Sequence, residues 1–198
     1  MPLLHCHAGV PSHPEKSTAG VTEKLPCLVS SEPVFEGRVF KVRSDVVAEN
    51  GKTVRFDIVE HPVSYTILAR PSADEVLLIR QYRHAVRGYL WELPAGSSEP
   101  GEDALDGVRR ELREETGYSA ETVREFLSSY MTPGFCTELM RYFVADGLTS
   151  GATEFDDDED IETRTFGIDR ALEMIESGEI VDAKTIAGLL YFTRFLRS

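Results

Sequence analysis

Three glutamates in one segment could together hold a divalent metal ion. Glu111, Glu114 and Glu115 lie in residues 103–116, whose apolar residues Ala104, Leu105, Val108 and Leu112 recur at helical spacing. Side chains three and four positions apart project from one face of a helix, so the three carboxylates share a stripe. Carboxylate oxygens are hard ligands, and no His or Cys accompanies them. The stripe therefore favours Mg²⁺ or Mn²⁺ over zinc.

The alternative explanation of these carboxylates is a solvated acidic helix face balanced by the arginines among them. Like charges at this spacing destabilise a helix unless a positive group compensates them, and Arg109, Arg110 and Arg113 are available for that. A Glu-Glu pair alone is insufficient to decide between a metal site and a solvated face. The residues before and after the helix distinguish a metal site from a solvated acidic face.

The wider pattern resembles the signature of the Nudix hydrolase family. It reads Gly96, five residues, Glu102, seven residues, Arg110-Glu111, an aliphatic residue, any residue, Glu114-Glu115, any residue and Gly117. Only the last position departs from the signature, because Tyr118 stands where an aliphatic residue is expected. We expect this departure to affect packing more than chemistry.

Neighbouring segments resemble the ADP-ribose pyrophosphatase branch of that family. Pro133 follows Gly117 by sixteen residues, which is the distinguishing proline spacing of the branch. Further similar segments are Glu36-Gly37-Arg38-Val39-Phe40, Val59-Glu60-His61-Pro62, Gln81-Tyr82-Arg83, Trp91-Glu92-Leu93-Pro94-Ala95-Gly96 and Gly178-Glu179-Ile180-Val181-Asp182-Ala183-Lys184-Thr185. The resemblance spans about residues 34–196.

This resemblance implies Mg²⁺-dependent hydrolysis of ADP-ribose to AMP and ribose 5-phosphate, with Mn²⁺ as a possible substitute. Metal ions would neutralise the diphosphate and lower the pKa of a bound water. Two alternatives stay open. One is hydrolysis of other nucleoside diphosphate sugars such as GDP-mannose, since few side chains read the base and the sugar. The other is a sensor that binds ADP-ribose without cleaving it.

The resemblance also implies roles around the metal. Glu111 and Glu115 are the expected principal ligands, Glu114 contributes, and the carbonyl oxygen of Ala95 is an additional ligand. Arg110 either orients the glutamates or forms a purely structural ion pair. Glu102 is expected to support the start of the helix.

A general base must come from outside this helix face. In the acidic segment 156–162, Glu159 corresponds to a loop glutamate that acts as base or metal ligand in related enzymes, and Asp157 is the second choice. Glu138 is a weaker alternative that would also contact the substrate.

Two further residues are candidates for substrate binding. Arg83 would clamp a phosphate with its guanidinium fork, or it is simply an arginine at the end of a surface strand. Phe56 would stack on adenine, or it is a core aromatic. The resemblance implies that this ring comes from the swapped N-terminal sheet of a partner subunit, and hence a homodimer.

The elements expected around these residues are mixed. Glu49-Asn50-Gly51-Lys52 predicts a hairpin turn between two strands. The remaining pattern predicts strands at 64–68, 75–80, 126–130 and 140–145 and closing helices at 170–177 and 183–196. This is an α+β class, and the resemblance implies a Nudix-type α/β/α sandwich with a mixed sheet. We expect a flexible extension at 1–30, a small antiparallel sheet at 31–60 and the hydrolase domain at 61–198.

Composition narrows the function classes. The chain has 198 residues, of which 41% are hydrophobic, and its net charge of −13 argues against nonspecific binding to nucleic acid or anionic membranes. Three scattered cysteines favour a reducing compartment, and no run approaches about 18 apolar residues. The sequence predicts a cytoplasmic protein.

Overall fold

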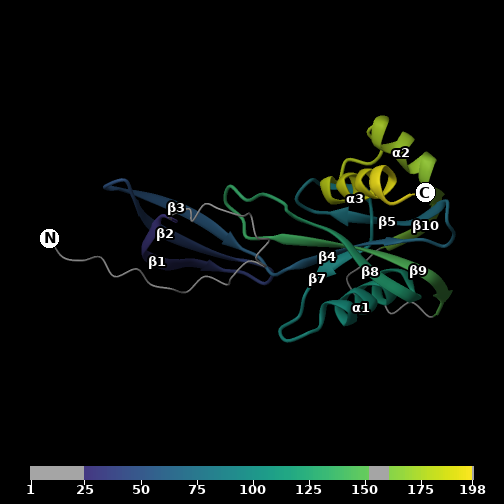
Figure 1. Ribbon diagram of the computed structural model, residues 1–198, viewed down its shortest axis with the longest axis horizontal. Coiled ribbons are helices and arrows are strands. Elements are labelled where there is room, and N and C mark those ends of the chain that lie inside the picture. The colour runs from purple at the N-terminus through teal and green to yellow at the C-terminus, as the bar shows by residue number, and fades with distance from the viewer. Residues whose placement is uncertain (1–24, 152–160, 198) are drawn as a thin grey trace. The chain divides into compact units, whose positions relative to one another are not determined.

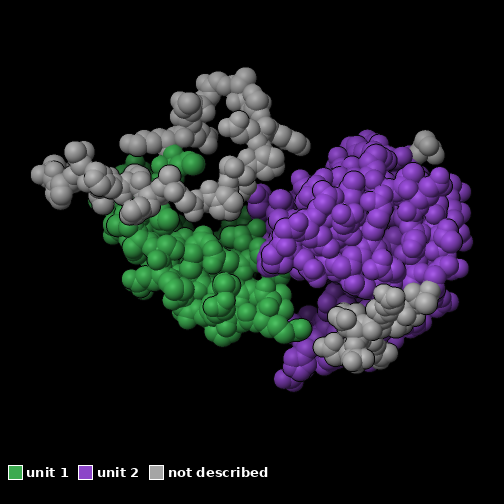
Figure 2. All heavy atoms as spheres, turned by 90° about the horizontal axis from the view of Figure 1, so that it is seen from below, with its two compact units in different colours: residues 1–61, 132–137 green, residues 62–131, 138–198 purple. Residues whose placement is uncertain are grey.

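The computed structural model describes residues 25–151 and 161–197. The predictions for residues 1–24 and those for Asp157 and Glu159 lie outside these described residues. The chain separates into two compact units, residues 1–61 with 132–137 and residues 62–131 with 138–198 (Figure 2). We describe each unit by itself.

The first unit holds a three-stranded antiparallel sheet in the order β1-β2-β3. Its strands are β1 (Cys27–Glu36), β2 (Lys41–Glu49) and β3 (Lys52–Glu60). The predicted hairpin turn is confirmed, since Asn50 and Gly51 have φ angles of 51° and 76°, as a two-residue turn with left-handed residues requires. Strand β1 begins inside the segment expected to be an extension, because Cys27 pairs with Ala48.

The second unit contains two sheets. Their orders are β7-β4-β9-β8 and β10-β5-β6. The bounds are β4 (Ser64–Ala69), β5 (Glu75–Arg83), β6 (Gly88–Glu92), β7 (Ala95–Ser97), β8 (Tyr118–Tyr130), β9 (Leu139–Ser150) and β10 (Ile161–Gly167). Strands β4 and β9 run parallel, whereas the other neighbours are antiparallel. The predicted mixed sheet is confirmed.

Helices cover both sides of these strands (Figure 1). Helix α1 (Ala104–Thr116) packs against β4, β7 and β8 and buries one apolar cluster that includes Val108 and Phe143. Helices α2 (Ile168–Glu176) and α3 (Ala183–Phe195) lie over a second cluster that includes Leu93 and Leu189. The α/β/α sandwich is therefore confirmed. No helix of residues 25–151 and 161–197 is long and apolar enough to cross a membrane.

The apolar face of α1 differs in one respect from the sequence pattern. Val108 and Leu112 are fully buried, but Leu105 is 38% exposed. Leu105 lies in the first turn, where Ala104 rather than Leu105 packs against the buried cluster. Helical spacing alone groups Leu105 with Val108 and Leu112 and would predict a core-facing Leu105. This expectation was wrong, because spacing gives the direction of a side chain but not the extent of the surface beneath it.

We expect Leu112→Ala to lower the free energy of unfolding by about 2–5 kcal/mol, because it leaves a cavity in a closed core. Leu105→Ala on the same helix is the matched control and should change it by less than about 1 kcal/mol. Urea denaturation of both variants checks this. Equal losses would contradict the assigned orientation of α1.

Candidate active site

The acidic stripe of α1 is packed against the sheet and is largely shielded from solvent. Glu111 is 9% exposed and Glu115 is 4% exposed, while the Glu114 side chain keeps 34% exposure. Helix α1 begins where the Asp103 carboxylate accepts from Leu105 N–H and ends at Gly117, whose φ is 72°. These two caps fix the helix, so that Glu111 and Glu115 face β7. A freely solvated acidic face does not describe these two residues.

Arg110 supplies the positive charge that the stripe requires. Its Nε and Nη2 donate to the two carboxylate oxygens of Glu102 at 2.8 and 3.0 Å. Its Nη1 donates to Glu111 Oε1 at 2.8 Å and to Glu114 Oε2 at 3.0 Å. These carboxylates raise the pKa of Arg110, the hydrogen bond with Glu102 first among them. One guanidinium thus holds three carboxylates in place, and its Nη2 also donates to Ser97 O at 3.2 Å.

The box glycine Gly96 leaves space for the carboxylate of Glu111. A Cβ at Gly96 would lie 1.9 Å from Glu111 Cδ and about 2 Å from both carboxylate oxygens. No larger residue fits without displacing Glu111. Burial raises the pKa of Glu111 above its usual value, although Arg110 opposes the shift. Glycine is therefore required at position 96, because any side chain there would overlap the carboxylate of the candidate metal ligand Glu111.

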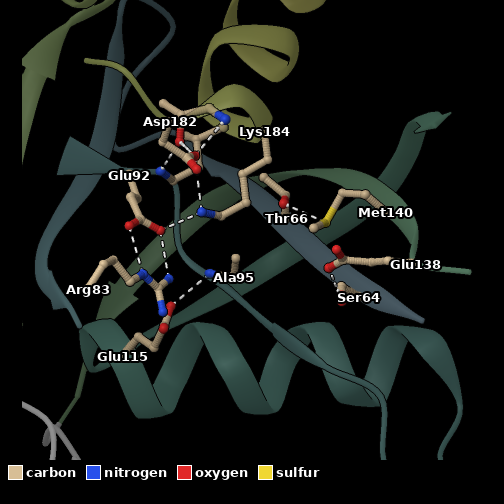
Figure 3. Close-up of polar contacts among 12 residues, drawn as sticks. Ser64, Thr66, Arg83, Glu92, Ala95, Glu115, Glu138, Met140, Asp182 and Lys184 are labelled. Atoms are coloured by element: carbon tan, nitrogen blue, oxygen red, sulfur yellow. Dashed lines mark hydrogen bonds and ion pairs between the residues drawn. The ribbon is translucent and has the colours of Figure 1, made fainter. Parts of the chain in front are cut away.

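Glu115 is held by backbone from the neighbouring strand. Ala95 N–H donates to Glu115 Oε2 at 2.8 Å, and Ala95 pairs with Thr66 in β4. Ala95 and Gly96 lie in the short strand β7. Figure 3 shows that Arg83 and Glu115 point toward one another. The charge of Glu115 contributes to a raised pKa of Arg83, after the larger effect of Glu92.

Arg83 belongs to a chain of charges that sequence reasoning missed. Its Nε and Nη2 donate to the two oxygens of Glu92 at 2.8 and 2.7 Å, and Lys184 Nζ donates to Glu92 Oε2. Lys184 also lies 3.0 Å from Asp182 Oδ2. Burial would raise the pKa of Glu92, but Arg83 and Lys184 together lower it below its usual value. Glu92 and Lys184 are 92 positions apart, so no local spacing could indicate their contact.

Of the remaining candidates, the structure describes Phe56 and Glu138. Phe56 belongs to the first unit, where it is 45% exposed in β3, so it is not a core aromatic there. Glu138 accepts from Ser64 Oγ at 2.9 Å. Glu159 and Asp157 lie outside the described residues, and the choice of base among Glu159, Asp157 and Glu138 stays open.

The donor set fits a divalent cation by its chemistry. Glu111, Glu114 and Glu115 offer carboxylate oxygens, the ligands that Mg²⁺ and Mn²⁺ prefer. Among residues 25–151 and 161–197, no three His, Cys, Asp or Glu side chains already converge as a metal cluster. Arg110 donates hydrogen bonds to one oxygen each of Glu111 and Glu114, and Ala95 N–H donates to one oxygen of Glu115. A bound cation would draw on the same carboxylates.

Comparison with known proteins places this geometry in a family. The model of the NUDIX domain matches residues 60–189. The chain belongs to the NUDIX domain family. The matched residues include the whole stripe, its arginine Arg110 and the segment that carries Lys184.

Relatives of the chain include proteins with several names. It is 35% identical to "Methanol dehydrogenase activator" of Bacillus methanolicus and 34% identical to "ADP-ribose pyrophosphatase" of Bacillus subtilis (strain 168), each over 82% of this chain and 90% of the relative. It is 38% identical to "GDP-mannose pyrophosphatase" of Salmonella arizonae (strain ATCC BAA-731 / CDC346-86 / RSK2980), over 81% and 91%. A solved structure titled "Crystal structure of ADP compounds hydrolase" matches with a TM-score of 0.78 and 22% identity, covering 90% of this chain and 100% of that one, which supports the fold.

We expect Gly96→Ala to lower the free energy of unfolding by about 1–3 kcal/mol, because the added methyl group must displace Glu111 from Arg110. Gly167→Ala is the matched control, since the nearest atom to its new Cβ would be Asp74 O at 4.0 Å. Urea denaturation gives the energies, and a crystal structure of Gly96→Ala gives the position of Glu111. An unmoved Glu111 would contradict the steric argument.

Proposed function

We propose that this NUDIX hydrolase cleaves the diphosphate bond of ADP-ribose to AMP and ribose 5-phosphate with the help of Mg²⁺. The observation that carries the proposal is the convergence of Glu115 from α1, the Ala95 N–H from β7 and Arg83 from β5. It places carboxylates suited to a cation beside a guanidinium suited to phosphate oxygens. The ADP-ribose pyrophosphatase name of a relative at 34% identity supports the choice of substrate.

The proposal gives the residues of the acidic stripe and its arginine separate roles. Glu111 and Glu115 would hold Mg²⁺, with Glu114 and the Ala95 carbonyl oxygen as further ligands. When bound, the cation neutralises the diphosphate and lowers the pKa of water. Arg110 keeps the carboxylates oriented, since it donates to Glu111 and Glu114 at once.

Arg83 and Glu159 complete the proposed reaction. Arg83 would contact a phosphate while Glu92 holds its Nε and Nη2, which fixes the guanidinium before substrate binds. Glu159 is proposed as the base that takes the proton of the attacking water, with Asp157 and Glu138 as alternatives. This assignment rests on the family resemblance of segment 156–162.

A homodimer forms part of the proposal. The first unit exposes several large apolar side chains on its small sheet and on the connection between β1 and β2, listed here with Phe56: Val34, Phe35, Val39, Phe40 and Val54. Exposed apolar side chains of this size favour burial against another surface. We propose that Phe56 of one protomer stacks on the adenine bound by its partner. Location in the cytoplasm stays a prediction from the sequence.

A second candidate substrate is a nucleotide sugar such as GDP-mannose. The relative named GDP-mannose pyrophosphatase, at 38% identity, supports it, and the carboxylate stripe acts on the diphosphate that both substrates share. The base and the sugar are recognised elsewhere. A sensor without catalysis is less favoured, because all three box glutamates are present.

We expect wild-type protein with Mg²⁺ to release AMP and ribose 5-phosphate from ADP-ribose faster than it cleaves GDP-mannose or other nucleotide sugars. Hydrolysis in ¹⁸O-water, followed by mass spectrometry of both products, checks the substrate and the attacked phosphorus together. Faster turnover of another nucleotide sugar would replace ADP-ribose in the proposal. Binding of ADP-ribose without AMP release would favour the sensor.

We expect Glu115→Gln to lower kcat by at least about 100-fold, because the amide keeps the shape of the side chain but removes its charge from the metal site. The free energy of unfolding should change by less than about 1 kcal/mol, since the amide oxygen still accepts from Ala95 N–H. Glu173→Gln, on the exposed side of α2, is the control. Unchanged kcat and metal dependence would reject Glu115 as a ligand.

A further inference from the structure

The start of α3 is built around Asp182. Its Oδ2 accepts from Thr185 N–H at 2.9 Å and from Thr185 Oγ1 at 2.6 Å, and it lies 3.0 Å from Lys184 Nζ. Thr185 is fully buried and Lys184 is 8% exposed. A buried lysine at the start of a helix is unusual, because both burial and the helix dipole disfavour a positive charge there. The family resemblance covers this segment without giving Lys184 a role.

Thr185 fastens the start of α3 to the strand that leads into the site. Its hydroxyl donates to Asp182 and accepts from Leu93 N–H at 2.8 Å. A hydroxyl has a single hydrogen, so these two contacts together fix its orientation. Leu93 is fully buried and directly follows Glu92 at the end of β6. The reach of Lys184 toward Glu92 is therefore set by the fold.

Glu92 stands between two cations. It is 1% exposed and accepts two hydrogen bonds from Arg83 and one from Lys184 (Figure 3). Arg83 Nη2 and Lys184 Nζ share one oxygen of this carboxylate, Glu92 Oε2, so the position of Arg83 depends on where Lys184 holds Glu92.

Arg83 lies between two carboxylates. Its Nε and Nη2 face the buried Glu92, whereas 40% of its side chain stays exposed. Glu115 lies on its other side. Arg83 is thus held beside the carboxylate proposed to hold the metal.

We propose that Lys184 is a positioning residue that acts through Glu92 to fix Arg83 where it can contact the substrate diphosphate. This inference rests on the proposed function and adds Lys184 as a residue that holds Arg83 in position for substrate binding. A purely stabilising ion pair is the competing explanation. Buried ion pairs are weak evidence for stability, since desolvation offsets much of their attraction.

The test compares Lys184→Met, Lys184→Gln and Lys184→Arg. We expect the Met and Gln variants to raise the KM for ADP-ribose about tenfold, because a charge-assisted contact to the diphosphate is weakened. Their kcat should stay within about threefold of wild type, since Arg83 holds the diphosphate before and during the reaction. Lys184→Arg should restore most of the KM. A merely structural role would not produce this separation of KM from kcat.

Arg70→Met is the matched control. Arg70 forms a partly buried ion pair with Asp146 at 2.7 Å in the same unit and takes no part in the proposed reaction. It should destabilise the protein without changing KM. An unchanged KM in folded Lys184→Met or Lys184→Gln, or the same rise in Arg70→Met, would overturn the proposal. Failure of both neutral variants to fold would also overturn it in favour of a structural role.

A crystal structure of the neutral variant separates this inference from the proposed function. We expect Arg83 to leave its position between Glu92 and Glu115 in that structure, whether or not ADP-ribose is the substrate. Wild-type protein that releases no AMP from ADP-ribose would refute the proposed function alone. An Arg83 that keeps its position in the variant would refute the role of Lys184 alone.

Discussion

The structure depends on neutralising carboxylates that are packed against backbone. Glu111 and Glu115 are almost buried on the sheet-facing side of α1, where unpaired negative charges would be costly. Arg110 and the Ala95 N–H meet that requirement from two directions. The arrangement fixes the acidic side chains in place between α1 and β7. Rigid ligands of this kind reduce the reorganisation that a reaction would otherwise require.

Neutralisation of a buried carboxylate is seen a second time around Glu92. There the carboxylate is more deeply buried, and two cations rather than one accompany it. Arg83 links the two groups, since it contacts Glu92 and lies beside Glu115. Elements from distant parts of the sequence, β5, β6 and the start of α3, meet at this point. Charge balance in the site is therefore a property of the whole second unit.

In the proposed function these features would act on the diphosphate, and they leave the base and the sugar unspecified. Relatives at similar identity carry ADP-ribose and GDP-mannose names. This is expected if the stripe and Arg83 act on the part that both substrates share. Selection between nucleotides then depends on other side chains, and the exposed Phe56 on the small sheet is our candidate for one of them.

The sequence by itself determined what depends on local spacing. The α1 stripe, its end at Gly117 and the turn at Asn50–Gly51 follow from helical period and backbone preference, which act over a few residues. The mixed α+β class and the family also followed, because the signature spans contiguous residues. Gly96 could be named from the sequence as the first residue of that signature, and Ala95 from the neighbouring segment that resembles the family branch.

Only the tertiary structure decided which groups distant in the sequence form ion pairs or pack against one another. Gly96 is required because the Glu111 carboxylate fills the place of its Cβ, and Lys184 matters because it reaches Glu92 from 92 positions away. Leu105 has the same helical spacing as Val108 and Leu112, yet it is 38% exposed while they are fully buried. Contacts of this kind arise from packing between elements, and packing is not encoded in any short run of residues.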